Sequence, residues 1–345
     1  MKKMTAMILP GLLCAMLLSG CSDPRPVLNI YNWADYMNPA VLKKFEKQYN
    51  CRIVLDTFDS NEAMYAKLKA GAQGYDLIFP TSYMAGIMKE QGMLQPLKQE
   101  LIPNIKNVDR KYLALTQDPQ MEYGVPYLIS VSGIGYNKAR LGELPPTWEL
   151  FGRPDITRRC TLLNDMRESI GAALKGLGYS LNTTSSKELA EAQQVLIAWK
   201  KNIAKFEVEE ALRGLSSSEF LLVHAYNGDI LQAMTENKDL GFLVPKEGTS
   251  IASDDMVIPV TADQVELAHA FINFIHEPAN AAENMEFVSY LSPNLEGQEL
   301  VSEAFRTNPA IFIDPAVIAK SEVIRDLGKD NDKYTRVWDA VKAAE

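Results

Sequence analysis

Apolar strands alternate with amphipathic helices along most of this chain, and no other feature of the sequence constrains the fold as strongly. Residues 27–31 have the pattern of a short strand, and Asn38 and Pro39 then supply an N-cap and a first-turn proline for a helix. The next strands are expected at 52–58 and 75–79, and the latter leads directly into a further helix. Strands that alternate with helices in this order predict a parallel, doubly wound α/β sheet.

The same alternation resumes after Gly133 and predicts a second lobe. Strands are expected at 160–163 and 221–225 around a helix at 188–200, and a late strand at 255–259 precedes an apolar helix. A chain of 345 residues exceeds what one hydrophobic core usually organises. We therefore expect two α/β lobes.

The start of the chain has the pattern of a secretory leader that ends in a lipid-attachment cysteine. Lys2 and Lys3 precede an apolar run that ends at Leu18, which is too short for a membrane-spanning helix. We expect residues 1–20 to be a lipoprotein signal peptide that is removed, and Cys21 to carry the acyl chains that anchor the protein at the periplasmic or cell surface. The alternative is an uncleaved anchor, which lacks a stop-transfer flank after Cys21.

The formal net charge indicates which partners the chain favours. It is −9 for the whole sequence and becomes −11 once the leader, which carries Lys2, Lys3 and no acid, is removed. This acidity argues against binding to nucleic acid and favours cationic partners.

Aromatic and acidic side chains recur together at the ends of the predicted strands. In open α/β sheets, ligands bind at the carboxyl ends of the strands, where helix N-termini normally favour anions. Several acids in that position would reverse the local polarity, so we expect a cleft that holds a cation. The acids are Asp35, Asp165, Glu168, Asp229 and Asp254.

Short segments in a fixed order extend this pattern over nearly the whole chain. They are residues Asn32 to Tyr36, Tyr75 to Pro80, Gly133 to Asn137, Asp165 to Glu168, Tyr226 to Asp229, Pro245 to Gly248 and Ser292 to Asn294. In this order and spacing, the chain resembles the polyamine receptors of bacterial ABC importers, the periplasmic spermidine- and putrescine-binding proteins.

The resemblance implies two doubly wound α/β lobes joined by crossing hinge strands, as in type II periplasmic binding proteins, with the ligand between the lobes. The N-terminal lobe would comprise residues 27–132 and about 255–297. The C-terminal lobe would comprise residues 133–254 and about 298–345. Such a receptor closes on its ligand and delivers it to a membrane permease, and we expect it to act as a monomer.

The resemblance also assigns binding roles to individual side chains. The residues implied as walls around the ligand are Trp33, Tyr36, Tyr83, Tyr226 and Tyr290. Asp35, Glu168 and Asp254 match family carboxylates that pair with ammonium groups. Asp165 matches a carboxylate of the spermidine type and Asp229 one of the putrescine type. Ser82 would be a polar contact beside Tyr83.

Departures from the family pattern bear on the choice of ligand. Ala252 stands where these receptors usually carry a second cleft tryptophan, Ile324 matches the position of a distal glutamine, and Tyr226 replaces a tryptophan. Because the acids are kept while part of the aromatic cage is missing, a putrescine-like diamine is favoured over spermidine. The alternatives are another small cationic solute bound by the same fold, or a surface sensor that signals to a membrane protein.

Each of these residues also has a structural explanation. Tyr36 and Tyr83 could fill the lobe interface with their hydroxyls in water. Asp165 could stabilise a helix dipole and Asp229 could cap a helix, while one of Asp254 and its neighbour Asp255 could be a solvated turn residue. The binding hypothesis depends on several positions meeting in one crevice.

The sequence contains no recognisable catalytic, metal or cofactor constellation. Of the three histidines, His269 and His276 lie seven positions apart on one apolar helix without an acidic or cysteine cluster at ligand spacing, and we expect both to be structural. No nucleophile elbow or glycine-rich phosphate loop is present. Cys51 and Cys160 are expected to be buried, and their spacing does not establish a disulfide. A binding protein is therefore favoured over an enzyme.

Overall fold

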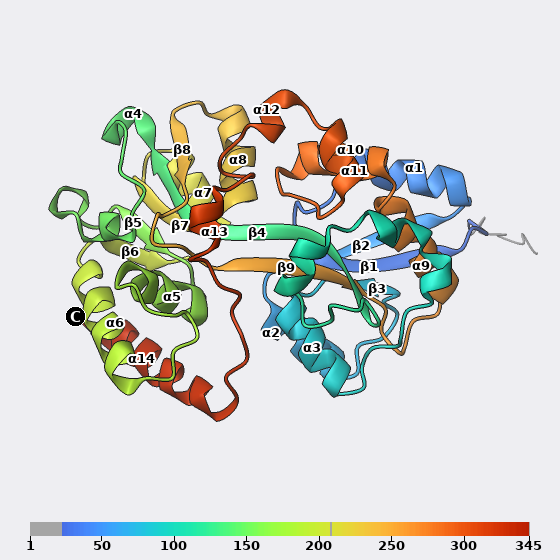
Figure 1. Cartoon of the computed structure of the whole chain (residues 1–345), viewed down its shortest axis with the longest axis horizontal. Coiled ribbons are helices and arrows are strands. Elements are labelled where there is room, and N and C mark those ends of the chain that lie inside the picture. The colour runs from blue at the N-terminus through green and yellow to red at the C-terminus, as the bar shows by residue number, and fades with distance from the viewer. Residues whose placement is uncertain (1–22, 208, 345) are drawn as a thin grey trace, which may run out of the picture.

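The computed structural model describes residues 23–207 and 209–344, which form two α/β lobes side by side (Figure 1). The lobes share a sheet with the strand order β2-β1-β3-β9-β4-β7-β5-β6, and β8 pairs with β4 outside that path. The strands are β1 (Val27–Trp33), β2 (Arg52–Phe58), β3 (Leu77–Ile78), β4 (Gly124–Asn137), β5 (Cys160–Leu162), β6 (Ile203–Phe206), β7 (Leu222–Tyr226), β8 (Leu240–Leu243) and β9 (Ile251–Val257).

Two strands, β4 and β9, connect the lobes. Residues 124–131 of β4 pair with β9, and residues 132–137 of β4 pair with β7 and β8 in the other lobe. All of these pairings are antiparallel, whereas β1 is parallel to β2 and β3, and β5 is parallel to β6 and β7. The predicted parallel pairing is confirmed for β1, β2 and β3, whereas the crossing strands run antiparallel to their neighbours. The two lobes and their crossing strands are as expected.

Helices cover both faces of the sheet in each lobe (Figure 1). The long helices on the β1 side are α1 (Pro39–Tyr49), α2 (Asn61–Lys69), α3 (Ser82–Glu90), α9 (Val265–Ile275) and α10 (Pro278–Val288). Those on the β7 side are α5 (Met166–Gly176), α6 (Ser186–Trp199), α7 (Glu209–Ser216), α8 (Asn227–Glu236) and α14 (Asn331–Ala343). Shorter helices are α4 (Lys138–Leu141), α11 (Leu295–Leu300), α12 (Glu303–Arg306) and α13 (Pro315–Ile318).

Local sequence explains how α1 forms. The side chain of Asn38 accepts a hydrogen bond from the Ala40 backbone at 2.8 Å, and Pro39 occupies the first turn. Val41 and Phe45 are buried against the apolar strand residues of this lobe. The helix ends at Asn50, which adopts the left-handed conformation that asparagine tolerates.

The late strand begins earlier than the sequence pattern indicates. It is β9, Ile251–Val257, and not 255–259. Its polar residues lower the intrinsic strand preference, but pairing with β4 overrides that preference. Asp254 and Asp255 therefore lie within a strand with 6% and 1% exposure, and the interpretation of either one as a solvated turn residue is wrong.

The N-terminal end of the described chain is attached to the β1 side of the molecule. Arg25 pairs with Asp23 and donates to the backbone carbonyl of Cys51 at 3.1 Å, two residues before β1 begins. Cys51 and Cys160 are both buried, as expected, and the structure shows both as free thiols. The predicted leader and Cys21 lie outside the described residues. Within the described part of the chain, none of the helices has the length and apolar character needed to cross a bilayer.

Candidate functional site

Asp254 lies where β9 passes the end of β3. Its carboxylate accepts hydrogen bonds from two hydroxyl groups. Tyr36 donates its hydroxyl proton to Asp254 Oδ2 at 2.7 Å, and Thr81 donates to Oδ1 at 2.9 Å. Thr81 is brought there by an antiparallel bridge to Asp254 directly before α3. The Tyr36 hydroxyl is therefore bonded to a carboxylate and not left to water, so the structural explanation of Tyr36 as a plug with a wet hydroxyl is wrong.

A second aspartate joins this group from the other lobe. Tyr290 donates its hydroxyl proton to Asp229 Oδ1 at 2.7 Å, and its ring packs edge-on against Tyr36 with centroids 4.9 Å apart. Asp229 lies in the first turn of α8, whose N-cap residue is Tyr226, so the helix-cap explanation of Asp229 is wrong. The two aspartates are thus linked through a pair of contacting tyrosines.

Gly228 allows this contact, and a substitution there tests it. A Cβ at Gly228 would lie 2.1 Å from Cε2 of Tyr290, closer than side-chain atoms approach. Gly228→Ala should displace Tyr290 from Asp229 and lower the free energy of unfolding by about 2 kcal/mol. Chemical denaturation measures the change, with Gly176→Ala as the control, because a Cβ at that helical glycine meets its nearest neighbour at 3.4 Å. Equal stabilities for the two variants would contradict the prediction.

Two further carboxylates lie at the N-terminus of α5. Asp165 is the N-cap residue, and its side chain accepts hydrogen bonds from the backbone of Arg167 at 2.8 Å and of Glu168 at 2.9 Å. The cap explains the position of Asp165 structurally, as the dipole argument anticipated. Glu168 is 5% exposed, and Ser250 Oγ lies 2.8 and 2.7 Å from its two carboxylate oxygens.

Burial raises the pKa of all four of these carboxyl groups, because desolvation penalises the charged form. The pKa reaches about 6 at both Asp229 and Asp254, from an ordinary value of 3.8, so ionisation costs about 3 kcal/mol more than in water. Asp165 and Glu168 are neighbours, and the charge of Asp165 raises the pKa of Glu168 further. Across residues 23–207 and 209–344, none of the four forms an ion pair with lysine or arginine.

The remaining predicted aromatic residues differ in how closely they adjoin these acids. Burial raises the pKa of Tyr226, and the nearby charges of Glu168 and Asp165 raise it further. Tyr83 donates its hydroxyl to Glu62 Oε1 at 3.0 Å, and Asp165 contributes to its raised pKa after burial and Glu62. The hydroxyl of Tyr83 is therefore also bonded to a carboxylate.

Trp33 is the last residue of β1, and Asp35 follows it in an exposed turn. The Trp33 indole donates to the Phe79 carbonyl at 2.9 Å, and its ring lies 4.4 Å from that of Phe58. Asp35 is exposed and has a positive φ of 50°. Its charge contributes to the raised pKa of Asp229 after desolvation, so it lies close enough to affect that carboxyl group.

The side chain of Ser82 points away from the acidic group that its neighbour Thr81 contacts. It is 1% exposed, and its hydroxyl accepts a hydrogen bond from the Gln117 backbone at 2.8 Å. Ser82 and Asp255 line one small cavity, whereas Thr81 contacts Asp254. The structure therefore brings Thr81, and not the predicted Ser82, to the acidic group. The sequence-based prediction missed Thr81, Ser250 and Glu62. Of these three, only Thr81 had a signal in the sequence, because it follows directly after a predicted strand.

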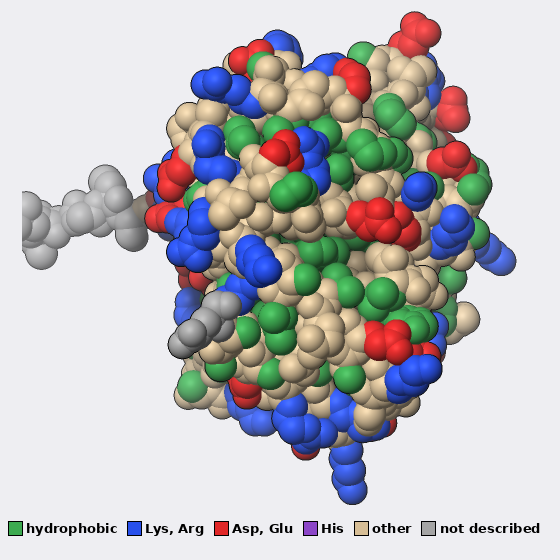
Figure 2. Space-filling view, turned by 90° about the vertical axis from the view of Figure 1, so that its left-hand side faces the viewer, with side chains coloured by type: hydrophobic (Ala, Val, Ile, Leu, Met, Phe, Trp, Pro, Cys, Tyr) green, Lys and Arg blue, Asp and Glu red, His purple; other side chains and the backbone are tan. Residues whose placement is uncertain are grey.

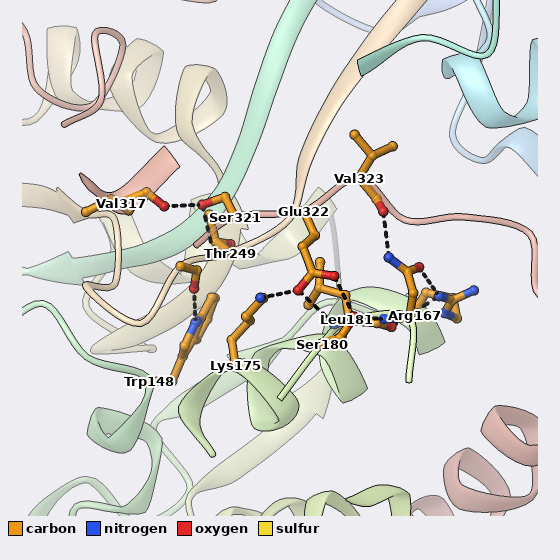
Figure 3. Close-up of polar contacts among 12 residues, drawn as sticks. Trp148, Arg167, Lys175, Ser180, Leu181, Thr249, Val317, Ser321, Glu322 and Val323 are labelled. Carbon is orange, nitrogen blue, oxygen red and sulfur yellow. Dashed lines mark hydrogen bonds and ion pairs between the residues drawn. The ribbon is translucent and has the colours of Figure 1, made fainter. Parts of the chain in front are cut away.

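A connecting segment, residues 319–327, holds α5 in place; we call it the strap. Figure 3 shows Glu322 between the hinge and α5. Its backbone pairs with Thr249 and Ile251 at 3.0 Å each, and its carboxylate accepts from Lys175 Nζ and from Ser180 Oγ. The helix that carries two of the carboxylates is thereby tied to strand β9, which carries a third.

Removal of the strap carboxylate should destabilise the protein. Lys175 has a side-chain exposure of only 8%, and Glu322→Gln would leave its ammonium without a carboxylate. Because Glu322 itself is 30% exposed, screening reduces the loss to about 2 kcal/mol of unfolding free energy. The matched control is Glu143→Gln, which breaks the exposed pair with Lys138 and should change stability by less than about 0.5 kcal/mol. Indistinguishable denaturation curves for the two variants would refute the role of the strap.

The outer surface contrasts with this acidic interior. Figure 2 shows one end of the molecule, where lysine and arginine side chains are interspersed with aspartate and glutamate. The four acids of the candidate site, in contrast, have no lysine or arginine within ion-pair distance among the described residues. Such a group is suited to a cationic solute, since an added positive charge would pair with carboxylates that the described protein leaves unpaired. No set of three metal-ligating side chains is found in the described part of the chain.

Comparison with known proteins identifies the family. Residues 40–313 match the family described as bacterial extracellular solute-binding protein. The chain belongs to this family. Among its relatives, the solute-binding protein is 32% identical to the spermidine/putrescine-binding periplasmic protein of Salmonella typhimurium, with 99% of both chains covered. It is 31% identical to the putrescine-binding periplasmic protein SpuD of Pseudomonas aeruginosa, over 100% of this chain and 98% of the relative.

Solved structures agree with this placement of the solute-binding protein. A putative spermidine/putrescine ABC transporter protein from Listeria monocytogenes matches with a TM-score of 0.84 and 33% identity, over 92% of this chain and 99% of that one. The Tp0655 lipoprotein of Treponema pallidum matches with a TM-score of 0.82 and 32% identity, over 91% and 99%. The fold and family of the solute-binding protein are therefore those expected from its sequence.

Proposed function

We propose that this solute-binding protein captures a polyamine between its lobes and delivers it to an ABC importer. The observation that carries the proposal is a set of four carboxyl groups without lysine or arginine partners in the described residues, two of them buried (Glu168 and Asp254) and two partly exposed (Asp165 and Asp229). Two ammonium groups on a flexible alkyl chain would supply the missing positive charge. The names of several relatives, which bind putrescine or spermidine, support the same ligand class.

The aromatic side chains provide the rest of the binding energy. The proposed walls are Trp33, Tyr36, Tyr83, Tyr226 and Tyr290, with Asp35 as a further contact and Thr81 in the place predicted for Ser82. An ammonium over an aromatic ring contributes about 0.5–2 kcal/mol, and burial of four methylenes adds about 3 kcal/mol. A micromolar dissociation constant corresponds to about −8 kcal/mol, so the carboxylates must contribute a net gain after desolvation. The charged groups bind the ligand and catalyse no reaction.

A putrescine-like diamine fits the site better than spermidine. Tyr290 fixes Asp229, the residue that matches the putrescine type, next to Tyr36 and Asp254. Ala252 lies two residues before Asp254 in β9 and so on the same face of the strand. Its methyl group leaves that side without the second aromatic wall that a longer ligand would use.

The remaining expectations form part of the same proposal. The N-terminal lobe would comprise residues 27–132 and about 255–297, and the C-terminal lobe residues 133–254 and about 298–345. The protein would be a periplasmic or cell-surface lipoprotein anchored through Cys21 and would act as a monomer. Its partner would be the permease of the importer.

Isothermal titration of the full chain in detergent tests the proposed ligand. Putrescine should bind with a dissociation constant in the micromolar range or below, and more tightly than spermidine. Cadaverine and agmatine test the tolerance for length and for a guanidinium end. Lysine methyl ester, which has two cationic groups but a branched backbone, is the control. If none of these amines binds below about 1 mM, the polyamine proposal fails, and a thermal-shift screen would identify another cation.

A further inference from the structure

His224 is a buried histidine with no satisfied ring nitrogen. It lies in β7 opposite Ile134 of β4, and it is 0% exposed. Neither ring nitrogen has a hydrogen-bond partner within the part of the chain that is described. Its imidazole meets Trp148 edge-on, with ring centroids 4.9 Å apart. Burial lowers its pKa to about 3, so the ring is neutral.

A neutral imidazole must still carry one N–H, and a buried N–H without an acceptor destabilises the folded protein. A carboxylate lies close to the ring: Nε2 is 4.0 Å from Oε2 of Glu168. A movement of about 1 Å would bring these atoms within hydrogen-bond distance. The Ser250 hydroxyl lies within hydrogen-bond distance of both Glu168 oxygens but has one proton to donate, and the Ser132 hydroxyl also favours the charged form of Glu168. The unsatisfied His224 donor is therefore adjacent to a carboxylate, which has lone pairs for more than the hydroxyls around it.

No other charged side chain lies within ion-pair distance of His224 among the described residues. Arg167, in the same turn as Glu168, points elsewhere: its guanidinium donates to the carbonyls of Arg325 and Leu181 and to Asn182 (Figure 3). From the strands and helices around it, His224 meets Ile134, Trp148 and Glu168. Glu168 is therefore the one titratable group that His224 faces at this range.

We propose that His224 is a positioning residue for ligand binding. Its Nε2–H donates to Glu168 once a bound ammonium makes that carboxylate ionise, and it holds the carboxylate in the orientation that receives the ligand. This role rests on the proposed function of Glu168. In the empty protein below about pH 7, where Glu168 is largely protonated, the histidine remains unsatisfied and lowers stability.

Replacement of His224 by an apolar and by a polar residue tests the role. His224→Met in the full chain removes the donor and should weaken putrescine binding about tenfold. It should also raise the unfolding midpoint of the empty protein by about 2 °C, since it removes an unsatisfied buried group. His224→Gln is the matched control, because its amide nitrogen can take the place of Nε2. It should retain affinity within about threefold of the wild type.

Several outcomes would overturn the proposal. Unchanged affinity in His224→Met would do so, and so would parallel losses of affinity and stability, which indicate a packing role. In a Glu168→Gln background, His224→Met should cause no further loss, and an additional tenfold loss would show that the histidine acts elsewhere. If the wild type binds no polyamine, the proposed function fails first.

The pairing can then be tested without ligand by ¹⁵N signals of the histidine rings. The chain has three histidines. His269 serves as an internal reference, since its Nδ1 lies 2.7 Å from the Val265 carbonyl and its Nε2 accepts from Lys98. The His224 signals should report a proton on Nε2 at pH 8 and should shift in Glu168→Gln. Signals that do not respond to this substitution would refute the pairing.

Discussion

Asp254→Asn should weaken putrescine binding by about a thousandfold. Asp254 is 6% exposed and receives hydroxyl protons from Tyr36 and Thr81, so an ammonium that reaches it forms a largely desolvated pair. Removal of one member of such a pair costs about 3–5 kcal/mol, which corresponds to a factor of about a thousand. Asparagine keeps the shape and the acceptor oxygen, so the loss measures the charge. Isothermal titration at pH 8 gives the two dissociation constants.

The adjacent residue provides the control. Asp255→Asn also removes a buried carboxyl group, but Asp255 contacts Ser253 on the other side of β9. The affinity of the Asp255→Asn variant for putrescine should remain within about threefold of the wild-type value. Asp254→Asn should also stabilise the empty protein at pH 8, because ionised Asp254 is disfavoured by about 3 kcal/mol in the folded state. If both variants lose affinity equally, the acidic group does not act through Asp254.

Acidification from pH 8 to pH 5 should weaken putrescine binding by at least about a hundredfold, since the pKa of Glu168 also lies in this range. The pKa of Asp229 and of Asp254 is about 6, because burial penalises their charged forms. At pH 5, about a tenth of each group is ionised, while the amines of the ligand remain charged. If the ligand requires both carboxylates in the ionised form, its affinity falls about tenfold for each of them. Titrations in buffers of different ionisation enthalpy should show protons released on binding near pH 6.

The same pKa values fix the sign of the stability change. Each folded-state pKa lies above the unfolded value of 3.8, so the folded protein binds more protons between about pH 4 and 6. The stability that these groups contribute is present below pH 4 and is lost as pH rises through 6. In the Asp229→Asn variant, the loss of affinity between pH 8 and pH 5 should be about tenfold smaller than in the wild type. A wild-type affinity that stays constant from pH 8 to 5 would contradict the raised pKa values.

Local patterns in the sequence were sufficient for the outer strands and helices. The strand 52–58 agrees with β2 at both ends, and the capping residues of α1 lie where the sequence places them. β4 could not be identified in this way, because Pro126, Gly133 and Gly135 are unfavourable in an isolated strand. Its 14 residues are extended because β9, β7 and β8 pair with them. The same non-local pairing shifted the start of β9.

The residues of the candidate site also fall into two sets, those that the sequence indicated and those that it did not. The sequence and its family resemblance indicated the acids that come together, since Asp254 and Asp229 are linked through Tyr36 and Tyr290. The resemblance pointed to Ser82 where the structure brings Thr81. Neither Ser250 nor His224 could be assigned, because each acquires its role from a neighbour on another element.

The attachment of Arg25 beside β1 has a mechanical consequence. Arg25 fastens the start of the folded chain to the carbonyl of Cys51 at one end of the molecule, and the C-terminus lies at the opposite end (Figure 1). A lipid on Cys21 would thus anchor the protein directly through the lobe that contains β1 and not through the other lobe. The lobe that contains β7 would be held to the membrane only through its connections to the other lobe, so an anchor of this kind would restrain the two lobes unequally.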